Sequence, residues 1–304
     1  MRANNLKENK VLTDKSEELF SKYQSPPSQV DIDPACFANC FGVQTRADLF
    51  FTAGEYAGRL IPGFPIPDDR VYGGQAEYTG LLTAFENRTS PSSFVAIELG
   101  AAWGPWVALA GVVAKRAGVE SIALVAVEAS EQKISSLEDH LSRNGLINVE
   151  GIETRVIHGA AWSEDTILHF PKEMPITDYG GAASSSESQN DYRGFTYETV
   201  PVQAYSLETL SKDFPRVDYM HWDIQGAERD LALASTDFLN ARVKHLYIGT
   251  HSRAIEGILM ETFFKMGGDL LWQQPCSFKY DKTKPSLEGM TTTDGEMLWA
   301  NPNI

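Results

Sequence analysis

FVAIELGAAWGPW, residues 94–106, is the stretch of this 304-residue chain that decides the fold. It consists of an apolar run, an acid at Glu98, a turn with glycines at positions 100 and 104, and the start of a helix. Glycine is favoured where the backbone must turn sharply or approach a ligand closely. Open α/β sheets bind their ligands at the carboxyl ends of their strands. The stretch therefore predicts a strand, a ligand-binding turn and a helix of a Rossmann-like α/β domain.

The sequence that follows keeps this rhythm, because apolar runs rich in Val, Ile and Ala alternate with helical periods. Such alternation is typical of buried parallel strands joined by crossover helices. We predict strands at 94–99, 121–128, 153–158, 217–224 and 243–250, with two more at 269–273 and 296–300 that close the sheet. Helices are predicted at 106–117, 131–144, 227–234 and 254–266, and an amphipathic helix at 73–85 precedes the first strand.

The glycine turn also indicates which ligand it binds. Its pattern, Glu98 followed by Gly100, Ala101 and Gly104, differs from the dinucleotide pattern GxGxxG, and a carboxylate at this place would repel a pyrophosphate. It would attract an ammonium group, and S-adenosylmethionine carries one together with a positive sulfonium. The bland alternative is that both glycines are ordinary turn residues.

Two further strand ends support a cofactor of this kind. Glu128, followed by Ala129, ends the second strand, where an acid can accept hydrogen bonds from both ribose hydroxyls. Ala160 and Ala161 follow the third strand and leave room for an adenine ring, with Trp162 packed beside it. A solvated strand end and a core tryptophan are the alternative interpretations.

The candidates for chemistry follow strands four and five. The segment HWDIQGAE places His221 and Asp223 at a strand end and Glu228 in the next helix, and His251 follows the fifth strand. Neighbouring strands would bring them to one crevice, where a histidine oriented by a carboxylate can take a proton from a hydroxyl. We predict His251 as the base, with His221 and Asp223 behind it. The alternatives are helix-capping roles for the two acids, or a divalent metal held by Asp223, Glu228 and His251; the metal-free interpretation is preferred.

Two segments do not follow the α/β rhythm. Residues 1–90 form a predicted N-terminal extension, in a lid or substrate-contacting role, to an S-adenosylmethionine-binding domain at 91–304. Helix-compatible stretches in the extension are seen only at 15–23 and 47–60. Between predicted strands at 166–170 and 199–204 lies GGAASSSESQNDYRG, residues 180–194, which is too polar to bury much apolar surface. A lid over the site and a surface insertion are both compatible with it.

Composition limits the partners. Forty-one acidic and 26 basic side chains give a formal net charge of −15, which repels nucleic acid and anionic lipid and favours a neutral or cationic small molecule. No apolar run is long enough to cross a membrane, no signal peptide begins the chain, and a cytoplasmic location is expected. Three cysteines suggest isolated thiols. Homo-oligomers are neither indicated nor excluded.

Taken together, these residues resemble the FkbM-type methyltransferase family. IELGAAWG is similar to its cofactor loop, VAVEA to its ribose-binding strand end, and HWDIQGAE followed by IGTHS to its most characteristic segment. The resemblance implies a seven-stranded sheet of order 3-2-1-4-5-7-6, S-adenosylmethionine as donor and O-methylation of a sugar or natural-product hydroxyl. It implies that Glu98, Gly100 and Gly104 bind the methionine end and Glu128 the ribose. Asp223, Glu228 and His251 would line the acceptor side.

Two other functions are weighed against this one. A nicotinamide-dependent oxidoreductase would use the same kind of sheet, but GxGxxG is absent and Glu98 stands where phosphates would bind. The second alternative is a non-catalytic binding module that has the same fold but no enzymatic activity.

Overall fold

The computed structural model describes residues 15–26, 31–49, 53–61, 73–187 and 190–304. Its centre is a seven-stranded sheet of order β11-β14-β10-β9-β3-β4-β5. Numbered along the chain, this is the predicted order 3-2-1-4-5-7-6, so the predicted fold is confirmed. Only β14 runs against its neighbours β10 and β11. The strands are β3 (Ser93–Leu99), β4 (Ser121–Glu128), β5 (Ile152–His158), β9 (Val217–Trp222), β10 (Val243–Thr250), β11 (Asp269–Gln274) and β14 (Gly295–Ala300).

Helices cover both faces of this sheet, as the near-continuous burial of β4 and β9 requires. Side chains of three helices share one apolar core: α2 (Gln75–Glu86), α3 (Pro105–Arg116) and α4 (Glu131–Arg143). The other core contains side chains of α5 (Leu207–Leu210), α6 (Glu228–Ala234), α7 (Thr236–Arg242) and α8 (Arg253–Lys265). The predicted helices agree with α2, α3, α4, α6 and α8 to within two residues at each end, whereas α5 and α7 were not predicted.

The fourth strand, β9, is shorter than predicted: it ends at Trp222 and not at Ile224. The chain turns there through two residues with positive φ, Gln225 at 50° and Gly226 at 100°. Asp223 therefore lies at the carboxyl edge of the sheet, just before this turn, where its amide still bonds to the carbonyl of Leu99.

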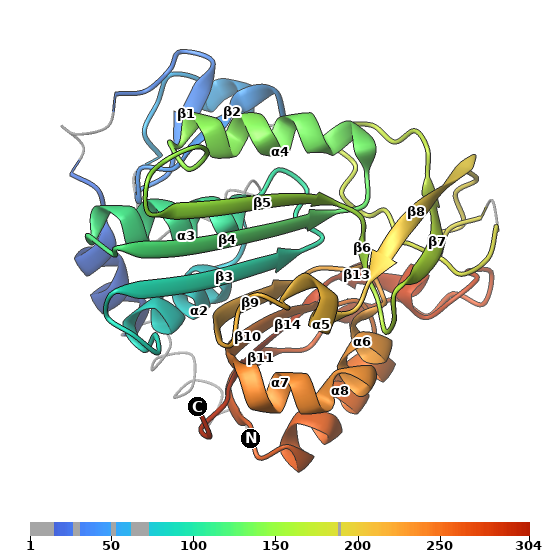
Figure 1. The fold of residues 1–304 in the computed structure, drawn as a ribbon. Helices are drawn as coiled ribbons and strands as arrows, with labels where there is room; N and C mark the ends of the chain where they lie inside the picture. The colour runs from blue at the N-terminus through green and yellow to red at the C-terminus, as the bar shows by residue number, and fades with distance from the viewer. Residues whose placement is uncertain (1–14, 27–30, 50–52, 62–72, 188–189) are drawn as a thin grey trace.

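A second, small sheet lies beyond the carboxyl ends of β3, β4 and β5 (Figure 1). It contains β6 (Ala160–Ala161), β8 (Thr199–Tyr205) and β7 (Thr166–Pro171) in that order, and β7 and β8 are antiparallel. The two strands predicted around the polar stretch are therefore confirmed. The small sheet has its own core, which includes Leu168, Phe170 and Ala204.

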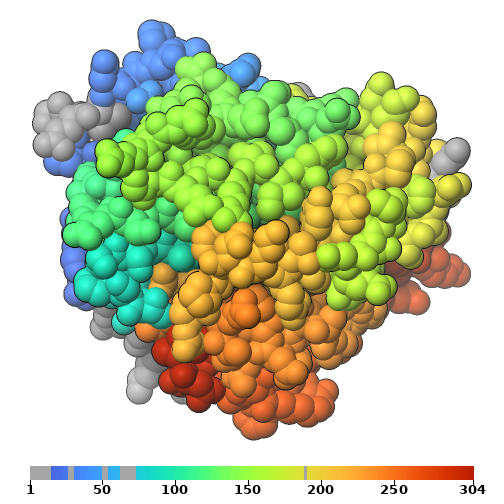
Figure 2. Space-filling view, in the orientation of Figure 1, coloured from blue at the N-terminus to red at the C-terminus, as the bar shows by residue number. Residues whose placement is uncertain are grey.

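The segment of residues 36–46 packs on the outside of α4, whereas residues 15–23 contact α2 (Figures 1 and 2). A two-stranded sheet of β1 (Cys36–Ala38) and β2 (Gln44–Arg46) lies there, and residues 15–23 are helical as predicted. The stretch 47–60, which is helix-compatible by sequence, contains no α-helix in its described part but two 3₁₀ turns, η2 (Ala47–Leu49) and η3 (Ala53–Tyr56).

The remaining elements are short: β12 (Ser277–Phe278), β13 (Thr291–Thr293) and η4 (Glu288–Met290). All three cysteines are buried. Across the described ranges, no helix has both the length and the apolar composition of a membrane span.

Candidate active site

A cavity of about 160 Å³ opens at the carboxyl edge of the large sheet, between the ends of β3, β4 and β9. Nine of the residues predicted for the site line it: Glu98, Gly100, Ala101, Glu128, Ala129, Ala160, Ala161, His221 and Asp223. They come from segments far apart in the sequence, and the crossing of the strand order at β3 and β9 brings them together.

The glycine turn lies directly against the segment that follows β9. Gly100 has φ 74°, and a Cβ atom at this position would lie 1.8 Å from the carbonyl oxygen of Asp223. The amide of Asp223 in turn donates to the carbonyl of Leu99 at 3.0 Å. Only glycine fits here, for both conformation and space, and the close approach holds the predicted cofactor turn beside the predicted catalytic acid.

Glu98 is almost completely buried at the start of α3. Its Oε2 accepts hydrogen bonds from the amides of Val107 at 2.8 Å and Trp106 at 3.1 Å. These amides begin the helix and need an acceptor, because the N-cap residue Gly104 has no side chain to bond them. Burial raises the pKa of Glu98 to about 8, against the opposing effect of these amides. A positive group in the cavity would restore the carboxylate. Neither Glu98 nor Glu128 is therefore a solvated strand end, since both are buried.

Glu128 is held rigidly by the backbone on both sides. Its Oε2 accepts from the amide of Ala102 and its Oε1 from that of Ser130, each at 2.7 Å. A carboxylate has about four acceptor positions, so two remain for hydroxyl groups in the cavity. Ala102 itself has φ 50°, which directs its amide toward Glu128.

Asp223, His251 and Glu228 form a continuous chain of charges. His251 Nδ1 lies 2.7 Å from Glu228 Oε1, and its Nε2 lies 3.2 Å from Asp223 Oδ1. The side chains of His251 and Glu228 are 4% and 0% exposed, whereas that of Asp223 is 46% exposed and faces the cavity. The structure thus brings the predicted trio together but places only Asp223 on the cavity.

The electrostatics of this chain favour a protonated histidine. Burial alone would lower the pKa of His251, but Glu228 and Asp223 outweigh it and raise that pKa well above its usual value. Burial likewise opposes the charge of Asp223, yet its contact with His251 keeps the pKa of this acid low. His251 therefore acts as a cation that holds Asp223. Within the described residues, no three potential ligand side chains are grouped as a metal site requires.

His221 is buried between two aromatic rings on the other side of the cavity. Its ring stacks on Trp106 and on Tyr247, with centroids 5.3 and 4.9 Å away, and its Nε2 lies 3.1 Å from Glu77 Oε1. Burial lowers the pKa of His221 to about 3, so the imidazole is neutral.

Four predicted site residues do not line the cavity. Gly104 has φ 74° and shapes the start of α3 from behind. Trp162 packs against the core of the small sheet, because the chain leaves the large sheet after Gly159. Trp162 therefore does not line the cavity, and its predicted position beside the adenine is wrong. Glu228 and His251 lie behind Asp223.

The sequence did not reveal several residues that do line the cavity. Glu77 reaches it from α2, and Lys133 from α4, where the Lys133 ammonium donates to the carbonyl of Asp178 at 2.6 Å and lies 4.5 Å from the ring centroid of Tyr179. The segment between β7 and β8 contributes Tyr179, Gly181 and Ala183. The polar stretch of residues 180–194 thus begins on the cavity wall, which supports the lid interpretation over a remote insertion.

This segment is held in place by ion pairs and by a link to the site. Arg193 donates to Asp178 and Asp191 at 2.8 Å each. The Tyr192 hydroxyl donates to Gln225 Oε1 at 2.7 Å, and Gln225 Nε2 donates to Asp223 Oδ1 at 2.8 Å. Polar contacts of this kind order a stretch that is too polar to bury much apolar surface, and the sequence alone does not show them.

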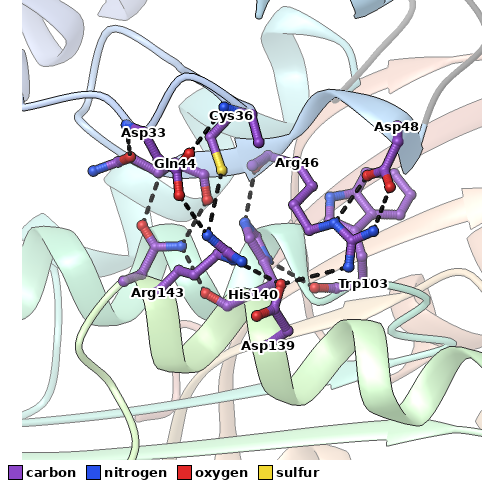
Figure 3. A network of polar contacts seen from close by, with 12 residues as sticks. Asp33, Cys36, Gln44, Arg46, Asp48, Trp103, Asp139, His140 and Arg143 are labelled. Atoms are coloured by element: carbon purple, nitrogen blue, oxygen red, sulfur yellow. Dashed lines mark hydrogen bonds and ion pairs between the residues drawn. The ribbon is translucent and has the colours of Figure 1, made fainter. Parts of the chain in front are cut away.

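The N-terminal strand β2 is linked to the cofactor turn through a side chain of α4 (Figure 3). His140 Nδ1 lies 2.7 Å from the carbonyl oxygen of Trp103, and its Nε2 lies 2.8 Å from the Thr45 hydroxyl. Burial lowers the pKa of His140 to about 4, so the ring is neutral. A neutral imidazole can donate from Nδ1 to the Trp103 carbonyl and accept at Nε2 from the Thr45 hydroxyl. Arg143 ties Asp33 to the same helix at 2.8 Å.

Comparison with known proteins gives consistent matches. Residues 98–266 match the family model described as the methyltransferase FkbM domain. A protein of Jannaschia sp. (strain CCS1), provisionally described as a methyltransferase, is 29% identical over 275 residues, which cover 89% of this chain and 94% of that protein.

Two solved structures are similar at low sequence identity. The methyltransferase FkbM of Methylobacillus flagellatus KT has a TM-score of 0.40 and 13% identity, covering 73% of this chain and 54% of that one. The precorrin-6Y C5,15-methyltransferase of Geobacter metallireducens GS-15 has a TM-score of 0.38 and 10% identity, covering 73% and 87%.

The sheet order, with an acid-rimmed glycine turn at its carboxyl edge, defines the fold of class I methyltransferases. The chain belongs to the FkbM methyltransferase family, whose model matches more than half of its length. The predicted family is confirmed, S-adenosylmethionine is the cofactor it implies, and the oxidoreductase alternative is set aside. The cavity fits this cofactor, because Glu98 and Glu128 present acceptor oxygens to it, and the small residues Gly100 and Ala101 line it between them.

We expect the binding of S-adenosylmethionine at pH 7 to release a proton from Glu98. In the free protein the raised pKa of about 8 keeps this carboxyl largely protonated. The ammonium of the cofactor favours the carboxylate and lowers that pKa. Affinity should therefore rise with pH up to about 8 and weaken below it by up to about tenfold per pH unit.

Calorimetric titration in buffers of different ionisation enthalpy measures this proton release. Glu98→Gln should abolish it, whereas Glu77→Gln, which alters a carboxyl on the other side of the cavity, should keep it. An unchanged proton release in Glu98→Gln would contradict the assignment.

Proposed function

We propose that this methyltransferase transfers the methyl group to a hydroxyl oxygen of a sugar or natural-product small molecule. The observation that carries the proposal is the position of Asp223, whose exposed carboxylate faces the cavity directly beside the glycine turn. A hydroxyl needs a base to take its proton as it reacts, and a carboxylate beside the donor turn can supply it.

Each residue of the site has a distinct role in this proposal. Bound S-adenosylmethionine supplies an activated methyl group, with Glu98 at its ammonium and Glu128 at its ribose. Gly100 and Ala101 form the floor of its site, and Ala129, Ala160 and Ala161 surround the adenine. Asp223 receives the hydroxyl proton, while the cation of His251, fixed by Glu228, holds the carboxylate in orientation. Asp223 thus replaces His251 as the proposed base.

Several predictions from the sequence remain part of the proposal. Residues 91–304 are the catalytic domain, and residues 1–90 an extension that supplies cavity residues such as Glu77. The acceptor is a small molecule, with neither nucleic acid nor membrane as partner, and the location is cytoplasmic.

Two measurements test the proposal together. We expect S-adenosylmethionine to bind with measurable heat, and Glu128→Ala to weaken binding by about a hundredfold, because about two charge-assisted hydrogen bonds are lost. Glu131→Ala, an exposed acid at the start of α4, is the matched control and should bind as the parent does.

The second measurement follows transfer of a labelled methyl group to a panel of hydroxyl compounds, with the methylated atom identified by mass spectrometry. Methyl groups found on nitrogen, carbon or sulfur would refute the hydroxyl acceptor. Cofactor binding without transfer to any member of a broad panel would favour the non-catalytic module.

The Tyr192–Gln225 link predicts that the lid segment helps to orient Asp223. We expect Tyr192→Phe to lower kcat roughly tenfold, the effect of about one lost hydrogen bond on the reacting geometry, with little change in the KM for S-adenosylmethionine. Tyr197→Phe is the control, since its hydroxyl contacts Asp178 in the same segment and not Gln225. Equal losses of kcat in both variants would show a general effect on the lid.

A further inference from the structure

The carboxylates of the cavity fall into two groups along the sheet. Glu98 and Glu128 end β3 and β4, where the cofactor is proposed to bind. Glu77 and Asp223 lie toward β9 and β10, because α2 packs on these strands and Asp223 follows β9. The strand order therefore places Glu77 and Asp223 on the side left for the acceptor, a deduction that rests on the proposed function.

Glu77 lies beside His221, and the backbone amide of Gly74 donates to Glu77 Oε2 at 2.6 Å. His221 is neutral, and once a bound cation has restored the Glu77 carboxylate, His221 donates its Nε2–H to Glu77 and its Nδ1 carries a lone pair. That Nδ1 atom is buried without a hydrogen-bond partner among the described residues, while His221, 3% exposed, lines the cavity. The stacked rings of Trp106 and Tyr247 fix the plane of the imidazole.

On the described cavity wall no cationic side chain pairs with Glu77, whereas Asp223 is paired with the buried His251 behind it. Lys133 is the one basic side chain on the described wall, and it is engaged beside Tyr179 and Asp178 on the cofactor side. Burial, together with Glu296, Asp223 and Glu98, raises the pKa of Glu77 well above its usual value. A ligand with positive charge and N–H donors would relieve this penalty, whereas a phosphate or carboxylate would increase it.

We propose that the acceptor is an amino alcohol, whose protonated amine binds Glu77 and His221 while its hydroxyl lies at Asp223. An ammonium group offers three donors and no acceptor, which matches the lone pair of His221 and the carboxylate of Glu77. The same charge pattern excludes sugar phosphates and nucleotide sugars as acceptors.

Binding to the complex with S-adenosylhomocysteine tests this proposal without turnover. The probes are matched pairs, glucosamine with N-acetylglucosamine and ethanolamine with N-acetylethanolamine, in which acetylation removes the charge and keeps the hydroxyl. We expect at least one amine to bind tenfold or more tightly than its acetylated partner in calorimetric titration. Glu77→Gln should remove this preference, and Glu86→Gln, at the exposed end of the same helix, should keep it.

The affinity for S-adenosylhomocysteine separates the possible failures. It should change less than threefold in Glu77→Gln, and a tenfold loss would make Glu77 a cofactor ligand and overturn the proposal. Equal binding of amines and amides, or no binding of any amine, would overturn it as well while leaving the methyltransferase assignment intact. If S-adenosylhomocysteine itself failed to bind the parent protein, the proposed function would fail instead.

Discussion

Replacement of Asp223 by asparagine is expected to lower kcat by about a thousandfold. General base catalysis by a positioned side chain contributes roughly 10²–10⁴ in rate, and asparagine keeps the shape of the side chain but cannot take the proton. The Asp223 carboxylate is the exposed end of a chain whose other members, His251 and Glu228, are buried. The loss should therefore appear in kcat, and the KM for S-adenosylmethionine should change less than threefold.

The measurement uses an acceptor identified from the hydroxyl panel, at saturating cofactor. Asp230→Asn is the matched control, since Asp230 lies in the following helix and pairs with Arg229 on the surface. A kcat of Asp223→Asn within threefold of the parent would move the proton acceptor elsewhere, first to the His221–Glu77 pair. Replacement of His251 is a poorer test, because it leaves the charge of Glu228 buried and unpaired, which costs about 3–5 kcal/mol of stability.

The sequence predicted the composition of the cavity better than the orientation of its side chains. Glu98, Glu128 and Asp223 were placed correctly, because carboxyl ends of neighbouring parallel strands meet at one edge whatever the packing around them. His251 was expected in the same crevice and does lie next to Asp223. It does not line the cavity, because its ring is bound to the buried carboxylate of Glu228. The order of the strands does not determine this ion pair.

Residues that depend on tertiary docking were not predictable. Glu77 stands 144 positions before its partner His221, and no local pattern shows on which strands its helix will pack. The same holds for Tyr179 and Tyr192, which reach the site from an irregular segment. Trp162 was misplaced because the sequence does not show that the chain enters a separate small sheet after Gly159.

Replacement of Gly100 by alanine is expected to damage both the fold and cofactor binding more than any other single change at the turn. The new Cβ atom would lie 1.8 Å from the carbonyl oxygen of Asp223, and this atom belongs to the backbone and cannot rotate away. Relief requires the turn and the segment after β9 to separate, which breaks the contact between Leu99 and Asp223. We expect a fall in Tm of more than about 5 °C, and at least about a hundredfold weaker binding of S-adenosylmethionine.

Gly118 provides a control with nearly the same backbone conformation. Its φ is 76°, against 74° for Gly100, but no atom lies within 4 Å of the position that a Cβ would take. Gly118→Ala should therefore cost only the strain of a left-handed alanine, roughly 1–2 kcal/mol, and leave cofactor affinity unchanged. The difference between the two variants, by calorimetry and cofactor titration, isolates the contribution of the close approach. If both lose the same stability and affinity, the contact of the cofactor turn with Asp223 is not what requires a glycine at position 100.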